Sequence, residues 1–101
     1  MVKHIILWKL REELSAEEKE TVKAGIKAGL EGLQGVVPGL LSVHVQTCGV
    51  LPSSTADVML DCTLESAEDL KGYAKHPAHV EVANTKVRPY TAVRTCLDFE
   101  A

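Results

Sequence analysis

The chain has 101 residues, of which 46% are hydrophobic and 25% charged, and its formal net charge is −3. This length fits a single domain over residues 1–101, and the composition is that of a globular protein rather than a disordered one. The charge balance, without a basic patch interleaved with aromatics, argues against nucleic-acid binding. Apolar runs stay well short of the roughly 20 residues that a bilayer requires, and the opening residues lack a signal-peptide pattern. We therefore expect a cytoplasmic protein without a membrane partner.

The three cysteines, Cys48, Cys62 and Cys96, are odd in number and widely spaced. Since there is no C-x-x-C pair, the sequence predicts neither a disulfide framework nor a zinc site. We expect three small, mostly buried side chains in a reducing compartment.

The first predicted element is a strand over residues 2–10. Alternation places His4, Ile6 and Trp8 on one face and leaves Ile5 on the other. Because both faces are largely apolar, we expect this strand to be covered on both sides. His4 would then point into apolar surroundings.

A helix is predicted to follow the capping-box sequence S-A-E-E at residues 15–18. Val22 and Ile26 repeat on one face of this helix. Gly25 and Gly29, one turn apart, either allow close packing against a sheet or leave room for a ligand, and we favour packing.

The second strand is predicted over residues 41–48, with Leu41, Val43 and Val45 on one face and His44 on the polar face. We expect His44 at the surface or in an interface. The pattern is the cleanest amphipathic alternation in the chain.

The third strand is predicted over residues 56–64, with Asp57 and Asp61 on its mixed face. The two carboxylates could form a metal pair, but no further carboxylate cluster is near in the sequence. A metal site here is therefore disfavoured.

A second helix is predicted to begin at the Ser66 cap and to stop or kink near His76, because Pro77 lacks an amide hydrogen and clashes with the preceding turn. Proline suits the first position of a new helix, so residues 78–87 should form another helical turn or two. The last strand is predicted over residues 90–99.

The order strand, helix, strand, strand, helix, strand is that of the α+β ferredoxin-like βαββαβ fold. Its four-stranded antiparallel sheet carries the helices on one face only. Ile5 and Leu7 on the opposite face would form an exposed apolar patch of a kind that monomers avoid. We therefore predict a twofold homodimer packed sheet against sheet, forming an α/β barrel.

The segment around Pro77 places Tyr73, His76 and His79 within seven positions. Tyrosine and histidine together can donate and accept protons near neutral pH. In the alternative interpretation, Pro77 only breaks a helix, His76 caps it and His79 lies on the surface. A metal bound by His76 and His79 is a weaker hypothesis, because Pro77 disturbs the helical spacing that such a pair needs.

The chain resembles the stress-responsive dimeric α/β-barrel proteins, the Dabb family. The resemblance covers nearly the whole chain and rests on residues 2–10 (VKHIILWKL), 37–40 (VPGL), 69–73 (DLKGY), 76–80 (HPAHV) and 98–99 (DF). It implies the ferredoxin-like unit paired into a barrel. The family includes plant polyketide cyclases that perform aldol chemistry without a cofactor. The resemblance thereby implies catalytic roles for Tyr73 and His79, with His4 lining the same pocket.

In that scheme His79 acts as general base towards a proton next to a carbonyl, and Tyr73 donates to the carbonyl oxygen. The predicted ligand pocket comprises His4, Ile6, Trp8, Val22, Ile26 and His76. No cofactor and no metal are predicted. The first helix lacks the aromatic residues that the cyclases place there, which weakens the case for an aromatic polyketide substrate.

Three functions remain open at this point. The first is a stress-responsive-type dimer that binds an unidentified small molecule. The second is a cofactor-independent cyclase or lyase that uses His79 and Tyr73. The third is a cofactor-free monooxygenase, because related dimeric α/β barrels perform such chemistry.

Overall fold

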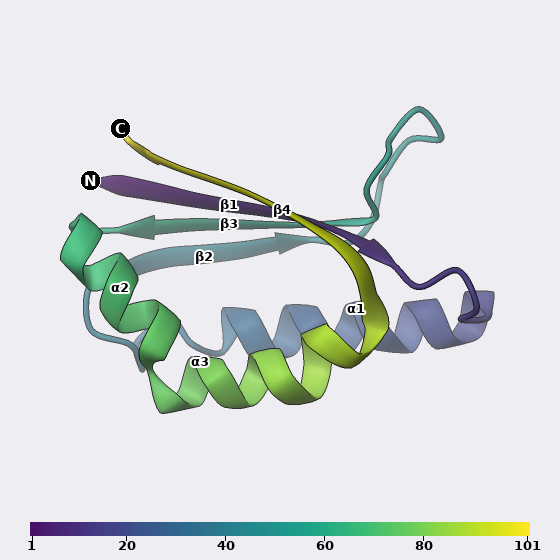
Figure 1. Cartoon of the computed structure of the whole chain (residues 1–101), viewed down its shortest axis with the longest axis horizontal. Helices are drawn as coiled ribbons and strands as arrows, with labels where there is room; N and C mark the ends of the chain where they lie inside the picture. The colour runs from purple at the N-terminus through teal and green to yellow at the C-terminus, as the bar shows by residue number, and fades with distance from the viewer.

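The computed structural model describes residues 1–101 and confirms the predicted fold class. A four-stranded antiparallel sheet has the order β2-β3-β1-β4, and every helix lies on one side of it (Figure 1). The elements are β1 (Val2–Leu10), α1 (Ala16–Glu31), β2 (Leu40–Gln46), β3 (Val58–Leu64), α2 (Ala67–Lys75), α3 (Pro77–Val82), the π-helical turn η1 (Ala83–Val87), the 3₁₀ turn η2 (Arg88–Tyr90) and β4 (Thr91–Glu100). None of the helices combines the length and the apolar character that crossing a bilayer demands.

The helix starts follow from side-chain caps. The Ser15 hydroxyl accepts a hydrogen bond from the Glu18 amide, and the Glu18 carboxylate accepts one from the Ser15 amide, each at 3.0 Å. This confirms the predicted capping box. The Ser66 hydroxyl likewise accepts from the Asp69 amide at 3.2 Å, which begins α2.

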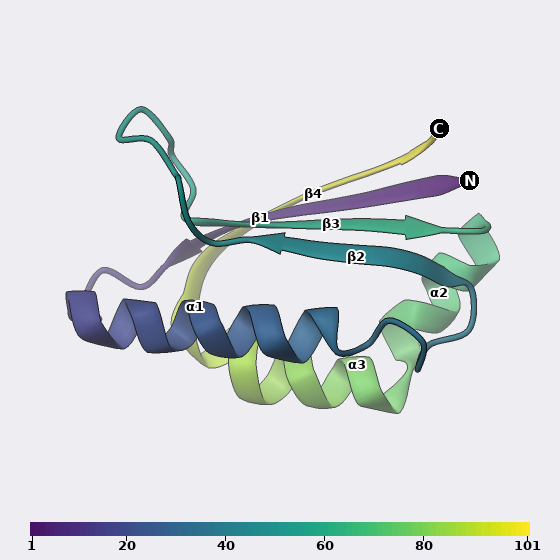
Figure 2. The same cartoon turned by 180° about the vertical axis from the view of Figure 1, so that it is seen from behind.

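The core lies between the helical layer and the sheet. β1 buries alternate residues, among them Ile6 and Trp8, and α1 buries Val22, Ile26 and Leu30 against them. This is the face that the strand period predicts for His4, Ile6 and Trp8. These side chains of β1 therefore face the helical layer, which covers one side of the sheet (Figure 2).

Gly29 brings α1 close to α3. A Cβ atom built on Gly29 would lie 2.8 Å from Cγ1 of Val82, and one built on Gly25 would lie 3.6 Å from Cδ of Lys86. Gly29 thus serves close packing, but against the second helical segment rather than against the sheet, whereas a side chain at Gly25 would make only an ordinary contact. The reason is that α1 and α3 lie side by side on the same face of the sheet (Figure 2).

The pairing of β2 with β3 corrects the predicted inward face of β2. The pairing register shifts between Leu40 and Ser42, so Leu40 is buried and Leu41, predicted to share a face with Val43, is exposed. An irregularity of this kind breaks the strict alternation on which the prediction rested. His44 is exposed, as expected.

Two of the three cysteines contradict the expectation of burial. Cys62 is buried in β3, but Cys48 and Cys96 are exposed. Cys48 follows the end of β2, and Cys96 lies on β4, an edge strand whose residues are largely exposed. The cause is position in the fold: Cys48 lies beyond the end of β2, and Cys96 shares the helix-facing side of the sheet with His4 but lies on the edge strand, where it stays exposed.

The disfavoured metal pair on β3 has other partners. Asp57 accepts a hydrogen bond from the Leu10 amide at 2.8 Å, which ties the start of β3 to the end of β1. Asp61 forms an ion pair with Lys3 at 2.6 Å. Both carboxylates therefore have roles within the sheet.

The sheet face away from the helices carries exposed apolar side chains. On β4 these are Val93, Leu97 and Phe99, and across the pairing Leu97 lies opposite Ile5 of β1. Leu7 on the same face of β1 is also exposed. We call these residues (Ile5, Leu7, Val93, Leu97 and Phe99) the far face.

Candidate active site

A cavity of about 380 Å³ lies between the helical layer and the sheet. Its walls come from β1, β3, the C-terminal part of α1, α2, α3, the two following turns and the first half of β4. The floor is largely apolar, and the polar side chains that line it are His4, Tyr73, His79, Arg88, Thr91 and Arg94.

Pro77 is the reason that Tyr73 and His79 face each other. Residues six apart on an unbroken α-helix would lie about 120° apart around the axis. The extended backbone at His76 (φ −62°, ψ 131°) ends α2, and Pro77 begins α3 in a new direction. As a result the ring centroids of Tyr73 and His79 are 4.3 Å apart, with the planes inclined at 43°.

His79 lines the cavity with a ring that has an unpaired buried nitrogen. Its Nδ1 atom is buried without a hydrogen-bond partner. Burial lowers the pKa of His79; the nearby Ala74 carbonyl partly opposes this, while the charges of Arg88 and Arg94 add to it. The imidazole is therefore held neutral and able to accept a proton.

Tyr73 is buried at the end of α2 and keeps its hydroxyl proton available. The one polar contact of its oxygen is with the Cys62 thiol, which donates across 4.0 Å. Burial raises the pKa of Tyr73 and raises that of Cys62 to about 12. Tyr73 is accordingly a hydrogen-bond donor throughout the neutral range.

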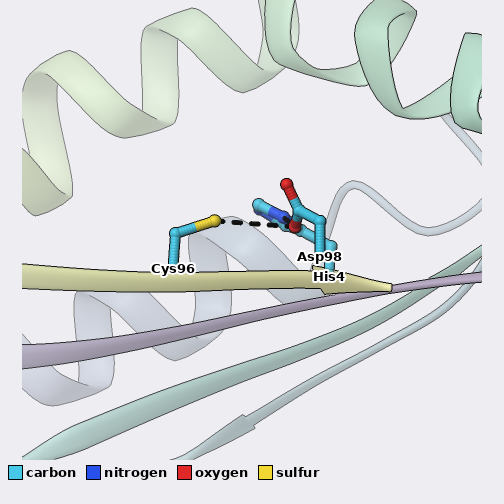
Figure 3. Close-up of side chains that lie close together, drawn as sticks. All are labelled: His4, Cys96 and Asp98. Carbon is cyan, nitrogen blue, oxygen red and sulfur yellow. Dashed lines mark hydrogen bonds and ion pairs between the residues drawn. The ribbon is translucent and has the colours of Figure 1, made fainter. Parts of the chain in front are cut away.

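His4 forms a second pair, with Asp98 (Figure 3). The two residues lie opposite each other on β1 and β4, and Nδ1 of His4 contacts Oδ1 of Asp98 in a short hydrogen bond or ion pair. A carboxylate at Nδ1 fixes the proton there and leaves Nε2 as the acceptor. The His4 ring also meets Tyr73 edge-on, at a centroid distance of 5.9 Å.

Cys96 completes a small cluster beside this pair. Its thiol donates to Asp98 Oδ1 at 3.5 Å, and the ligand atoms of His4, Cys96 and Asp98 all lie within 4.8 Å of one another (Figure 3). These donor types are ones that zinc accepts. The hydrogen bonds among the three side chains account for the arrangement without an ion.

The structure brings together five of the predicted site residues and separates three others. His4, Ile6, Trp8, Tyr73 and His79 line the cavity. His79 is half-buried, so it does not lie on the surface as the alternative interpretation expected.

Val22, Ile26 and His76, which were predicted to line the pocket, do not line this cavity. Ile26 is fully buried in the core, and Val22 borders a separate groove beside Ser15 and Lys86. The Nδ1 atom of His76 accepts a hydrogen bond from the Ala78 amide at 3.1 Å, which makes His76 the cap of α3.

Sequence reasoning missed the partners that come from the end of the chain. The sequence singles out Asp98 only as part of a family motif, and it does not identify Arg88 or Arg94 as site residues. The fold prediction implied that the first and last strands pair, but it could not give the register that sets Asp98 opposite His4.

The sequence matches the family described as the Stress responsive A/B Barrel Domain (Dabb) over residues 2–101. The chain belongs to the Dabb family. A search of curated proteins finds no significant match.

Solved structures similar to this Dabb chain share its fold over almost the full length. A dimeric protein of unknown function with a ferredoxin-like fold from Bacteroides fragilis is 31% identical, with a TM-score of 0.91 over 99% of this chain and 95% of that one. A hydroxynitrile lyase from Passiflora edulis is 18% identical, with a TM-score of 0.71 over 97% and 90%. A protein provisionally assigned as an antibiotic biosynthesis monooxygenase, from Nitrosomonas europaea, is 11% identical, with a TM-score of 0.75 over 100% and 98%.

Proposed function

We propose that this Dabb protein binds a small organic molecule in the cavity between the helical layer and the sheet. The observation that carries the proposal is the convergence of Tyr73, His79 and His4 on one largely apolar cavity of about 380 Å³. Apolar cavities with a few convergent polar groups are the usual form of small-molecule sites, and this volume falls at the lower end of their range.

Unpaired polar groups on His79 and Tyr73 support the proposal that the cavity holds a ligand. Nδ1 of His79 is buried without a hydrogen-bond partner, and the hydroxyl proton of Tyr73 has no acceptor within the chain. Unpaired polar atoms in an interior are costly, and a bound carbonyl or hydroxyl group would satisfy both.

The test is a thermal-shift screen of a metabolite library with three proteins. Wild type should be stabilised by some compounds, since a ligand at about 100 times its Kd adds about 2.7 kcal/mol to stability. Ala74→Phe places a large ring at the edge of the cavity and should lose these responses.

The matched control is Ala24→Phe, on the exposed side of α1. It should keep the responses of wild type. Equal responses in both variants would show that the compounds bind elsewhere, and a library without any stabilising compound would contradict the proposal.

We also propose that the protein is a homodimer through its far face. Leu97 and Phe99 are 61% and 44% exposed there, which is unfavourable for a lone subunit. The Bacteroides fragilis protein, similar over almost the whole chain, is described as dimeric.

The dimer can be tested by the mass of the protein in solution. Light scattering at micromolar concentration should give the mass of a dimer, and Leu97→Asp should lower it. Val36→Asp, an exposed apolar site outside the far face, should leave it unchanged. A monomeric mass for wild type would overturn this proposal.

A second candidate function is cofactor-independent acid–base catalysis of the cyclase or lyase type. It is favoured by the pairing of a neutral His79 with a protonated Tyr73, and the similar fold of a hydroxynitrile lyase is consistent with it. His79 would take a proton from the carbon next to a carbonyl, the C–H electrons would form the enolate, and Tyr73 would hydrogen-bond to the enolate oxygen.

The catalytic roles can be tested without knowing the substrate. In D₂O, wild type should accelerate exchange of the protons next to the carbonyl of 2-octanone, followed by NMR. His79→Gln should abolish this acceleration, and Tyr73→Phe should reduce it by roughly 10²-fold. Undiminished exchange in both variants would reject the roles.

The remaining hypotheses have weaker support. A cofactor-free monooxygenase rests on a likeness of fold alone. A part in a stress response rests on the family description, and a cytoplasmic location stays a prediction from the sequence.

A further inference from the structure

Two arginines stand at the cavity on different elements. Arg88 opens η2 and Arg94 belongs to β4, and both line the cavity with exposed side chains. They are two of the three arginines in the chain. The fold thus gathers most of its guanidinium groups at one site.

Neither guanidinium is neutralised by an acid. Arg88 donates to the amide oxygen of Asn84 at 2.6 Å, and neither Arg88 nor Arg94 forms an ion pair. No aspartate or glutamate lines the cavity, although the chain has 14 of them against 11 lysines and arginines. The residues that line the cavity therefore carry an excess of positive charge in a protein whose net charge is −3, and the nearest carboxylate, that of Asp98, is engaged with His4.

The positive charge acts on the interior of the cavity. Arg88 and Arg94 both contribute to lowering the pKa of His79, which indicates that their fields reach its ring. Charges beside low-dielectric walls are screened less than charges in open water, so Arg88 and Arg94 favour an anionic ligand.

We infer that the ligand is a small carboxylic acid with an apolar body. This inference rests on the proposed function, since it assigns the class of molecule that the same cavity holds. The carboxylate would lie between Arg88 and Arg94, whose planar guanidinium groups match it in geometry. The apolar body would lie over Ile6, Trp8 and Leu60, with Tyr73 and His79 reaching a polar group further along the molecule.

Trp8 provides a direct signal for this test. It is the sole tryptophan of the chain and lines the cavity. Its fluorescence should respond to 4-butylbenzoate and to 4-butylbenzamide, two probes of similar shape of which only the first is charged. At about pH 8, where the free imidazole is neutral, we expect the benzoate to bind at least about tenfold more tightly.

The arginines are tested by a double variant, Arg88→Gln with Arg94→Gln. It should bring the affinity for the benzoate down to that for the benzamide and leave the affinity for the benzamide unchanged. The control, Lys19→Gln with Lys71→Gln, removes two positive charges from residues that do not line the cavity and should keep the preference.

The possible binding results separate a failure of the carboxylate inference from a failure of the proposed function. Equal binding of the two probes to wild type, or a preference that survives in the double variant, would overturn the inference while leaving a small-molecule site in place. Tighter binding of 4-butylphenyl phosphate than of the benzoate would assign the arginines to a phosphate ester instead and overturn the carboxylate. No response to any of the three probes at millimolar concentration would overturn both the inference and the proposed function.

Discussion

The rings of Tyr73 and His79 lie against each other, with centroids 4.3 Å apart and planes inclined at 43°. Tyr73 lies in the last turn of α2 and His79 in the first turn of α3, so the contact depends on the change of direction at Pro77. The same contact places a proton acceptor and a proton donor at one cavity. The following predictions test the parts of this arrangement separately.

Tyr73 should stabilise the protein through its ring rather than its hydroxyl. Tyr73→Ala removes a buried aromatic ring and should lower the free energy of unfolding by about 3–5 kcal/mol. Tyr73→Phe removes one weak contact with the Cys62 thiol and should cost less than about 1 kcal/mol. Urea denaturation of both variants measures the difference. Similar large losses in both would mean that the hydroxyl has a structural partner.

Acid should destabilise the protein partly through His79. Its pKa in the folded protein is lowered, so the unfolded chain takes up the proton first as the pH falls. This contribution to stability is complete above the ordinary value of about 6.5 and is lost as the pH falls from there through the folded pKa. Wild type should therefore lose more stability between about pH 8 and pH 5 than His79→Gln, in urea titrations.

The control for the pH experiment is His44→Gln. His44 is exposed on β2, so this variant should follow wild type. Parallel pH profiles for wild type and His79→Gln would contradict the burial of a neutral imidazole.

The two glycines of α1 should respond in opposite ways to alanine. A Cβ atom on Gly29 would lie 2.8 Å from the branched Val82, and such overpacking costs about 1–3 kcal/mol. On Gly25 the nearest atom is the flexible Lys86 side chain at 3.6 Å, so the helix preference for alanine should dominate and add up to about 1 kcal/mol. Thermal unfolding of Gly29→Ala and Gly25→Ala measures both. Stabilisation by both variants would mean that α1 and α3 pack less closely.

The cluster of His4, Cys96 and Asp98 should work without a metal ion. We expect the melting temperature to stay the same after dialysis against EDTA and after addition of stoichiometric Zn²⁺, because these side chains already hydrogen-bond to one another. A zinc-dependent rise in melting temperature that disappears in Cys96→Ser would instead assign a zinc site to these residues.

The sequence predicts the fold well because the core follows simple periodicities. Alternation in β1 identifies the buried side of His4, Ile6 and Trp8, and two serine caps mark the starts of α1 and α2. Leu41 is an exception. The register of β2 shifts between Leu40 and Ser42, and a pattern of alternating residues cannot reveal such a shift. Pattern alone gives each element but not how neighbouring elements align.

The candidate site is only partly predictable for the same reason. Tyr73 and His79 stand close in sequence around Pro77, so their proximity can be foreseen. Asp98 reaches His4 through a register of β1 and β4 that no local signal specifies. His76 resembled a pocket residue by its neighbourhood, yet the free amide of Ala78 makes it a helix cap.

The most direct test of the central claim is the side-chain ¹⁵N NMR spectrum of the four histidines, recorded with and without the most stabilising compound of the library screen. If the ligand occupies the cavity, the ring-nitrogen signals of His79 and His4 should move. Those of His44, exposed on β2, and His76, engaged as a helix cap, should stay in place. Unchanged signals from both His79 and His4 in the presence of a bound compound would contradict the assignment of this cavity as the ligand site.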